Sequence, residues 1–236
     1  MTAQEVIESL KEASDKGKSL VLARFFKTGP GEYGEGDRFL GVTVPKQRIL
    51  AKKYQDLPFS EIKKLLISPW HEHRLTALLI LTYRFSISEI AQKREIFDFY
   101  LVHTERINNW DLVDVTAPGI VGEYLVESGL NIGLLRSLAK SQSLWERRIA
   151  IVSTFAWIRR GKHQECFEIA DILLHDSHDL IQKAVGWMLR EVDKRCGAKP
   201  LMDFLDNRTL EMPRTMLRYA IERFPEHTRQ KYLQRK

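Results

Sequence analysis

Apolar residues recur at helical spacing along almost the whole chain, and this pattern limits the folds available to it. Val6, Leu10 and Ala13, for example, are separated by four and three residues, which places their side chains on one face of an α-helix. No pair of segments shows the alternation of apolar and polar residues that is typical of paired strands. The sequence therefore predicts an all-α protein.

Five of the predicted helices are also similar to one another near their starts. Their aligned residues lie 37, 37, 35 and 31 positions apart, at Arg74, Asp111, Arg148, Lys183 and Arg214. Periods of this length are typical of helix-pair solenoids, in which each pair stacks on its neighbours because it cannot bury its apolar face alone. We therefore expect a single HEAT-like helical-repeat domain over residues 1–236.

Stacking of such repeats would bring the basic residues at equivalent positions to one curved surface, namely Arg74, Arg148, Lys183 and, as a less certain member, Arg214. The formal net charge is +6, which favours an anionic partner such as nucleic acid. The sequence thus predicts a basic concave groove that follows a phosphate backbone, with an affinity that falls as salt rises. The alternative is that about half of these cations lie on a solvated rim and balance acids such as Glu146 and Glu191.

Local signals mark several boundaries. Thr2 and Glu5 form a capping-box pattern, and Ser88 is the expected start of a helix over residues 89–102. Glycine and proline are so dense from residue 28 that we expect an irregular Gly-rich loop over residues 28–43. Pro118, Gly119 and Gly122 are expected to interrupt the helix that contains Trp110.

Composition and motifs exclude several classes of protein. No apolar run reaches the roughly 18 residues of a membrane span, and the start of the chain lacks the pattern of a secretion signal. We therefore expect a cytoplasmic protein. The two cysteines indicate neither a disulfide framework nor a zinc site. Motifs of hydrolase triads, nucleoside triphosphate sites and dinucleotide sites are missing from the sequence, so no metal or organic cofactor is expected.

One candidate site stands out from this background. Trp110 and Asp114 are four residues apart, and on a helix they share a face. Asp111 is expected to have a capping or structural role. The structural alternative is that Trp110 packs in the core and that Asp114 only pairs with a cation such as Arg148.

A second indole, Trp187, follows Lys183 by four residues and precedes Arg190 by three. On one helix these two cations would flank the ring. A core position is the alternative for this tryptophan. The motif His71-Glu72-His73 spaces its histidines two apart, which sends them in different directions on a helix and does not favour a metal site.

At these residues the chain resembles the AlkD-type DNA alkylation repair proteins, a family of HEAT-like DNA glycosylases. The resemblance spans most of the chain and is most specific at Trp110 to Asp114, around Arg148, and at residues 181–191. It implies catalytic roles for Trp110, Asp114 and Trp187 and a DNA contact for Arg148. The Gly-rich loop looks like an insertion relative to the best-known members.

The function implied is excision of positively charged N-alkylated purines from duplex DNA. Asp114 would stabilise the cationic sugar that forms, and the two indoles would contact the cation through their faces. Arg148, Lys183, Arg74 and Arg190 would bind DNA. We expect a monomer without a membrane partner. The alternative is a catalytically weak or inactive HEAT-like module that binds DNA or serves as a protein scaffold.

Overall fold

The computed structural model describes residues 1–235, and its helices form two compact units, one over residues 1–116 and one from residue 117 onward. The predicted single domain and the predicted concave groove depend on how the units join, and both stay predictions. Within residues 1–235 there is no β-strand, only an isolated bridge between Arg38 and Trp70. The predicted all-α class is confirmed.

The first unit holds a series of helices that pack around α5. These elements are α1 (Ala3–Glu12), α2 (Lys16–Phe25), α3 (Val44–Lys53), α4 (Phe59–Leu66), α5 (His71–Ile87), α6 (Ile90–Leu101), the 3₁₀ turn η1 (Thr104–Arg106) and α7 (Trp110–Ala117).

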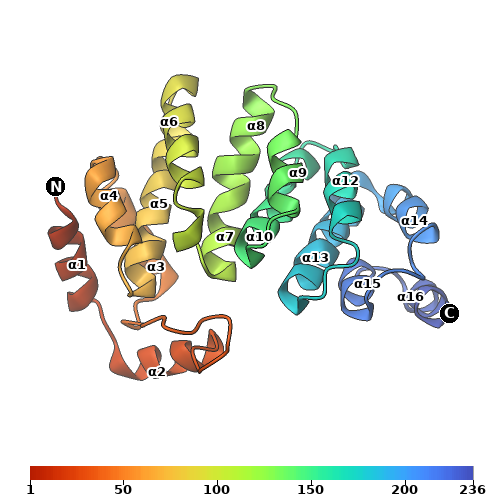
Figure 1. Cartoon of the computed structure of the whole chain (residues 1–236), viewed down its shortest axis with the longest axis horizontal. Coiled ribbons are helices and arrows are strands. Elements are labelled where there is room, and N and C mark those ends of the chain that lie inside the picture. Colours follow the sequence, from red (N-terminus) through yellow and green to blue (C-terminus); the bar gives the residue numbers. More distant parts are fainter. Residues whose placement is uncertain (236) are drawn as a thin grey trace. The chain divides into compact units, whose positions relative to one another are not determined.

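Helix α5 is the core element of this unit. Its residues 71–81 are all buried, because α3, α4 and α6 cover it from several sides (Figure 1). Removing a buried leucine such as Leu78 would cost about 2–5 kcal/mol. Helix α2 is the opposite case, since none of its residues is buried, and it lies at the lower edge of the unit in Figure 1.

The second unit is built around α13. It comprises the π-helical turn η2 (Pro118–Gly122), α8 (Glu123–Glu127), α9 (Gly133–Ala139), α10 (Leu144–Ser153), α11 (Phe155–Ile158), α12 (Gln164–Ile172), α13 (Asp179–Cys196), α14 (Ala198–Asp206), α15 (Arg214–Ala220) and α16 (Glu226–Gln234). Helices α10, α14 and α15 all pack on α13.

The repeat alignment agrees with the helix boundaries. Each aligned residue lies in the first five positions of a helix, namely α5, α7, α10, α13 and α15. The predicted interruption of the helix that contains Trp110 is also confirmed, because α7 ends at Ala117 and residues Pro118 to Gly122 form a π-helical turn. A Cβ on Gly122 would lie 2.3 Å from the carbonyl oxygen of Ser153, so this turn packs tightly against α10.

Two of the predicted helix starts can be compared directly. The capping box of Thr2 and Glu5 is confirmed at α1. The prediction of Ser88 as a helix start was wrong by one residue, since Glu89 is the N-cap of α6 and forms a reciprocal box with Gln92. Within residues 1–235, no helix is both long enough and apolar enough to span a membrane.

Candidate functional site

Trp110 and Asp114 lie one turn apart on α7, as the sequence predicts. Both residues are partly exposed, so neither is closed off in the core of the unit. Two residues after Asp114, the Thr116 hydroxyl lies 3.0 Å from that of buried Tyr100. Burial raises the pKa of Tyr100, and the negative charge of Asp114 raises it further.

Aromatic side chains from the end of α2 surround the indole of Trp110. The ring of Phe26 stacks on it, with centroids 5.2 Å apart and planes at 27°. Phe25 meets it edge-on at 5.9 Å. The indole nitrogen donates a hydrogen bond of 3.2 Å to the hydroxyl of Tyr33, which belongs to the Gly-rich loop. Trp110 is thus packed on one face and at one edge.

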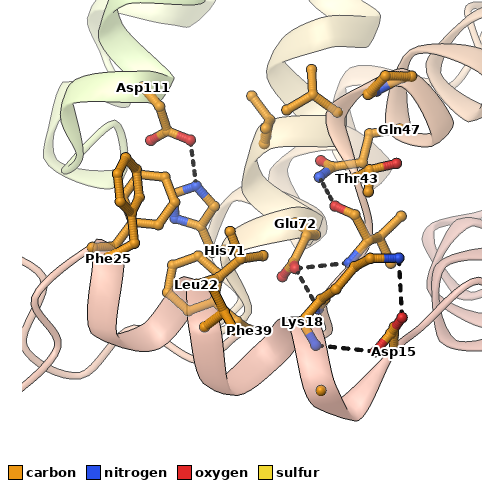
Figure 2. Close-up of a pocket in the computed structure, with 18 residues that line it drawn as sticks. Asp15, Lys18, Leu22, Phe25, Phe39, Thr43, Gln47, His71, Glu72 and Asp111 are labelled. Carbon is orange, nitrogen blue, oxygen red and sulfur yellow. Dashed lines mark hydrogen bonds and ion pairs between the residues drawn. The ribbon is translucent and has the colours of Figure 1, made fainter.

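A network of charged, largely buried side chains lies next to this aromatic cluster. His71 donates to Asp37 from Nδ1 at 3.2 Å and to Asp111 from Nε2 at 2.8 Å. Figure 2 shows the ring of His71 directed at Asp111. Arg74 donates to the other oxygen of Asp37 at 2.7 Å, and Asn109 completes the group at 3.4 Å. The predicted structural role of Asp111 is confirmed.

The protonation states of His71 and Asp37 follow from the groups that each of them contacts. Burial opposes a charge on His71, but the hydrogen bonds to Asp111 and Asp37 outweigh it and raise the pKa of His71 to about 9. Burial likewise opposes a charge on Asp37, yet His71 and Arg74 lower the pKa of this carboxyl. A cationic histidine is therefore held between two carboxylates near neutral pH.

A cavity of about 630 Å³ shares several of these residues. Its wall is mostly apolar, with Leu22 and Phe25 from α2 and Phe39 from the Gly-rich loop, and His71 and Asp111 lie at one end (Figure 2).

The loop that forms the cavity's far side is anchored by Glu72. This buried carboxylate accepts hydrogen bonds from the backbone N–H groups of Leu40, Gly41 and Val42 at 2.8 to 3.2 Å. Glu72 is only 1% exposed, and satisfying it with three donors avoids the large cost of an unpaired buried charge. The end of the Gly-rich loop is therefore fixed to α5.

Arg74 lies in this same interior. Its side chain is 4% exposed, and it bonds to Asp37 and to the carbonyl oxygen of Ser68. A buried and neutralised guanidinium has little surface to offer a phosphate. This placement favours a structural role for Arg74 over the predicted DNA contact.

In the second unit, α13 carries three of the predicted residues. Trp187 is partly exposed, Lys183 pairs with Asp179 at 2.6 Å while remaining 38% exposed, and Arg190 pairs with Glu222. The predicted placement of Lys183 and Arg190 on the same helix as Trp187 is confirmed.

Arg148 is more deeply placed than these residues. It lies on α10, is 5% exposed, and donates to the carbonyl oxygen of Leu180 in the first turn of α13 at 2.6 Å. This contact joins two helices of the second unit. As with Arg74, such burial leaves the guanidinium little surface for a phosphate. A DNA contact by Arg148 stays a prediction.

Several residues around Trp110 were not predicted from the sequence to lie at this site, above all Phe25, Phe26, Tyr33 and Asp37. His71 was considered only as a metal ligand. The sequence offers one local indication of these residues: an aromatic residue, Tyr33, and an acidic residue, Asp37, occur within a glycine-rich stretch. The hydrogen-bond partners of these two lie 77 and 34 residues away along the chain, beyond the reach of any helical spacing rule.

The fold and these residues define an all-helical repeat protein with a partly exposed carboxylate one turn from an aromatic-packed indole. A family model described as DNA alkylation repair enzyme matches residues 6–224. The chain therefore belongs to the DNA alkylation repair enzyme family.

Solved structures give the same fold. A predicted DNA alkylation repair enzyme from Enterococcus faecalis is similar with a TM-score of 0.70 at 14% identity, over 90% of this chain and 97% of that one. AlkD2 from Streptococcus mutans is similar with a TM-score of 0.55 at 20% identity, over 89% and 99% of the two chains. A search of curated protein sequences returns no match.

Proposed function

We propose that this protein is a DNA glycosylase that hydrolyses the N-glycosidic bond of positively charged N-alkylated purines, of the 3-methyladenine and 7-methylguanine type, in duplex DNA. One observation carries the proposal: Trp110 and Asp114 lie one turn apart on α7 and are both partly exposed, in a chain that belongs to the DNA alkylation repair enzyme family.

The chemistry suits a carboxylate beside an indole. An alkylated purine already carries a positive charge, so the bond from the sugar C1′ to the base nitrogen breaks with its electron pair passing to the base. The base leaves neutral, and positive charge develops on the sugar. In this proposal Asp114 stabilises that charge electrostatically and orients the water whose oxygen bonds to C1′. The attacking water then gives up a proton to the surrounding solvent, leaving an abasic sugar and a free purine.

Trp110 contributes a π face. Attraction between an indole face and a cation is on the order of 0.5 to 2 kcal/mol, which would help to hold the charged base or sugar. Trp187 on α13 is proposed to contact the cation through its ring face as well, and Lys183 and Arg190 on the same helix are proposed to contact the DNA. Lys183 is the better placed of the two cations for a phosphate contact, since it is 38% exposed against 24% for Arg190.

Replacing Asp114 with asparagine tests the proposal. This change keeps the shape of the side chain and removes its charge. We expect release of free 7-methylguanine from methylated duplex DNA to slow by about 100-fold, the scale at which loss of one preorganised electrostatic group is felt. Duplex affinity should change little. Single-turnover release measured by chromatography, with binding measured separately by anisotropy, gives both quantities.

Asp98→Asn is the matched control, because Asp98 is an exposed helical carboxylate of the same unit. It should release purine at the wild-type rate. Equal rates in Asp114→Asn and wild type would remove Asp114 from the mechanism.

A module that binds DNA or a protein partner without chemistry is the alternative function. It is favoured by the engagement of Trp110, whose nitrogen is bonded to Tyr33 and whose face is stacked on Phe26. The same assay separates the two: a wild-type protein that binds the methylated duplex and releases no purine is a binding module.

A further inference from the structure

The Gly-rich loop is a built structure held by its own hydrogen bonds. The carboxylate of Glu32 accepts from the N–H of Gly29 at 2.9 Å, and that of Glu35 accepts from the N–H of Gly31 at 2.8 Å. Acidic side chains that satisfy backbone donors in this way stabilise a fixed loop conformation. The loop can therefore hold a side chain at a defined place.

Gly34 brings the loop back onto the end of α2. Its N–H donates to the carbonyl oxygen of Lys27 at 3.1 Å. A Cβ on Gly34 would lie 2.4 Å from the carbonyl oxygen of Phe26, a distance that no side chain can accept without moving the backbone. Only glycine permits this approach, and it sets the neighbouring residue, Tyr33, beside α2.

Tyr33 makes the first of two attachments to α7. Its hydroxyl accepts from the indole nitrogen of Trp110 at 3.2 Å and donates to the carbonyl oxygen of Phe25 at 3.5 Å. The indole is therefore bonded at its nitrogen and stacked on Phe26 at one face. Rotation about its side-chain bonds would break the first contact and open the second.

Asp37 makes the second attachment, at the base of the loop. It reaches α7 through His71, which bonds to Asp111 at 2.8 Å, and through Asn109 at 3.4 Å. Asp37 is 5% exposed, and hydrogen bonds to ionised partners in such a site are stronger than those at the surface. The residues on either side of Trp110 are thus fixed to the loop.

We propose that the Gly-rich loop is a two-point clamp that positions Trp110, with Tyr33 fixing the indole and Asp37 fixing the first turn of α7. Both act as positioning residues and touch no substrate. The role rests on the proposed function of Trp110. Because Phe26 occupies one face of the ring, a cation would meet the opposite face in this proposal. The clamp restricts the ring before substrate binds, which lowers the entropy lost on binding.

The contact itself can be tested without any substrate. The chain has five tryptophans, so a ¹⁵N-labelled sample should give five indole N–H resonances, and Trp110→Phe identifies one of them. In Tyr33→Phe, which removes only the hydroxyl, we expect the Trp110 resonance to shift and its exchange with solvent to accelerate by about tenfold or more. The other four should stay in place. An unmoved Trp110 resonance with unchanged exchange would overturn the clamp.

The positioning role is tested by separating rate from affinity. In Tyr33→Phe we expect single-turnover release of 7-methylguanine to fall by about tenfold, because a misplaced group weakens the transition state, while duplex Kd stays within about twofold. Tyr83→Phe is the control, since the hydroxyl of Tyr83 has no hydrogen bond among those found in residues 1–235. Asp37→Asn should lower the rate in the same direction.

The outcomes separate the two proposals. If the wild type releases no purine, the proposed glycosylase function fails, and the resonance of Trp110 still decides whether the clamp exists. If the wild type is active and Tyr33→Phe moves the resonance without slowing release, the loop holds Trp110 but does not position it for chemistry, and the inference is wrong.

Discussion

Burial alone does not decide the protonation state of a side chain, as His71 and His73 show. They are two residues apart on α5 and both are buried. His71 meets Asp37 and Asp111 and has its pKa raised to about 9. Burial and then the nearby charge of Arg74 lower the pKa of His73 to about 4, and its ring bonds to the hydroxyl of Ser68. One is a cation and the other is neutral near pH 7.

The raised pKa of His71 predicts how stability depends on pH. The folded state binds this proton more tightly than the unfolded state, so the stabilisation is complete below the unfolded value of about 6.5 and is lost as pH rises toward 9. Asp37, Asp111 and Arg74 are the charged groups that face the ring. We expect the free energy of unfolding in urea to fall by about 1–3 kcal/mol over this interval.

Two variants test whether His71 causes this decrease in the free energy of unfolding. His71→Asn should be less stable than wild type at pH 6.5 and should lose this pH dependence. His73→Asn should retain this pH dependence. Because the pKa of His73 is lowered, its own contribution to the free energy of unfolding changes with pH only below about 6.5. A wild-type free energy of unfolding that stays level from pH 6.5 to 9 contradicts a charged His71.

At the scale of elements, glycines decide how closely helices approach. Gly186 lies in the middle of α13, where an added Cβ would be 2.5 Å from the carbonyl oxygen of Met216 and 2.5 Å from the Cβ of Tyr219. Both neighbours belong to α15. The glycine therefore permits close packing of α13 on α15 next to Trp187.

Gly186→Ala should consequently destabilise the second unit. Alanine would gain up to about 1 kcal/mol of helix propensity, but overpacking against backbone costs about 1–3 kcal/mol, so we expect a net loss in the free energy of unfolding. Gly133→Ala is the comparison, because its Cβ would meet only the side chain of Asn131, and moving that side chain would cost the single hydrogen bond that it accepts from the N–H of residue 133 and no backbone packing. Equal or greater stability of Gly186→Ala in urea titrations would show that the two helices can separate at little cost.

At the scale of the whole molecule, the net charge of +6 matters only if particular cations contact DNA. Lys183 and Lys199 form a matched pair for testing this. Each lies in an ion pair of 2.6 Å with an aspartate four residues away, Asp179 and Asp203. Glutamine at either position changes the net charge equally, so any difference in DNA binding reports position.

We expect Lys183→Gln to weaken binding to all duplex sequences and to reduce the slope of log affinity against log salt by about 0.9, the value for one phosphate contact. Lys199→Gln should leave the slope near that of wild type. Anisotropy titrations at several salt concentrations measure both. The same slope change in the two variants would assign the effect to net charge and remove Lys183 from the DNA contacts.

Much of the fold was predictable because it depends on neighbours within a helical turn. The apolar spacing around Leu10, the capping box of Thr2 and the π-helical turn after Ala117 all arise from residues close in sequence. The one-residue error at the start of α6 also has a local origin, since Glu89 and Gln92 cap this helix in place of Ser88. The spacing of Trp110 and Asp114 on α7 is of this kind too.

The surroundings of the site could not be predicted in this way. Arg74 is paired with an aspartate 37 residues away, Asp37, and the indole of Trp110 bonds to Tyr33 at a separation of 77 residues. Nothing in the local pattern of either partner indicates such a contact. A basic residue near a helix start is compatible with a groove and equally with a buried ion pair.

By itself, then, the sequence determined an all-α repeat protein and placed a carboxylate and an indole on one helical face. Only the tertiary structure decided which cations are buried, that His71 carries a proton, and that the Gly-rich loop reaches Trp110. The physical reason is one of range: backbone hydrogen bonding and helical periodicity act over three or four residues, whereas burial and charge pairing depend on segments that meet only when the chain has folded.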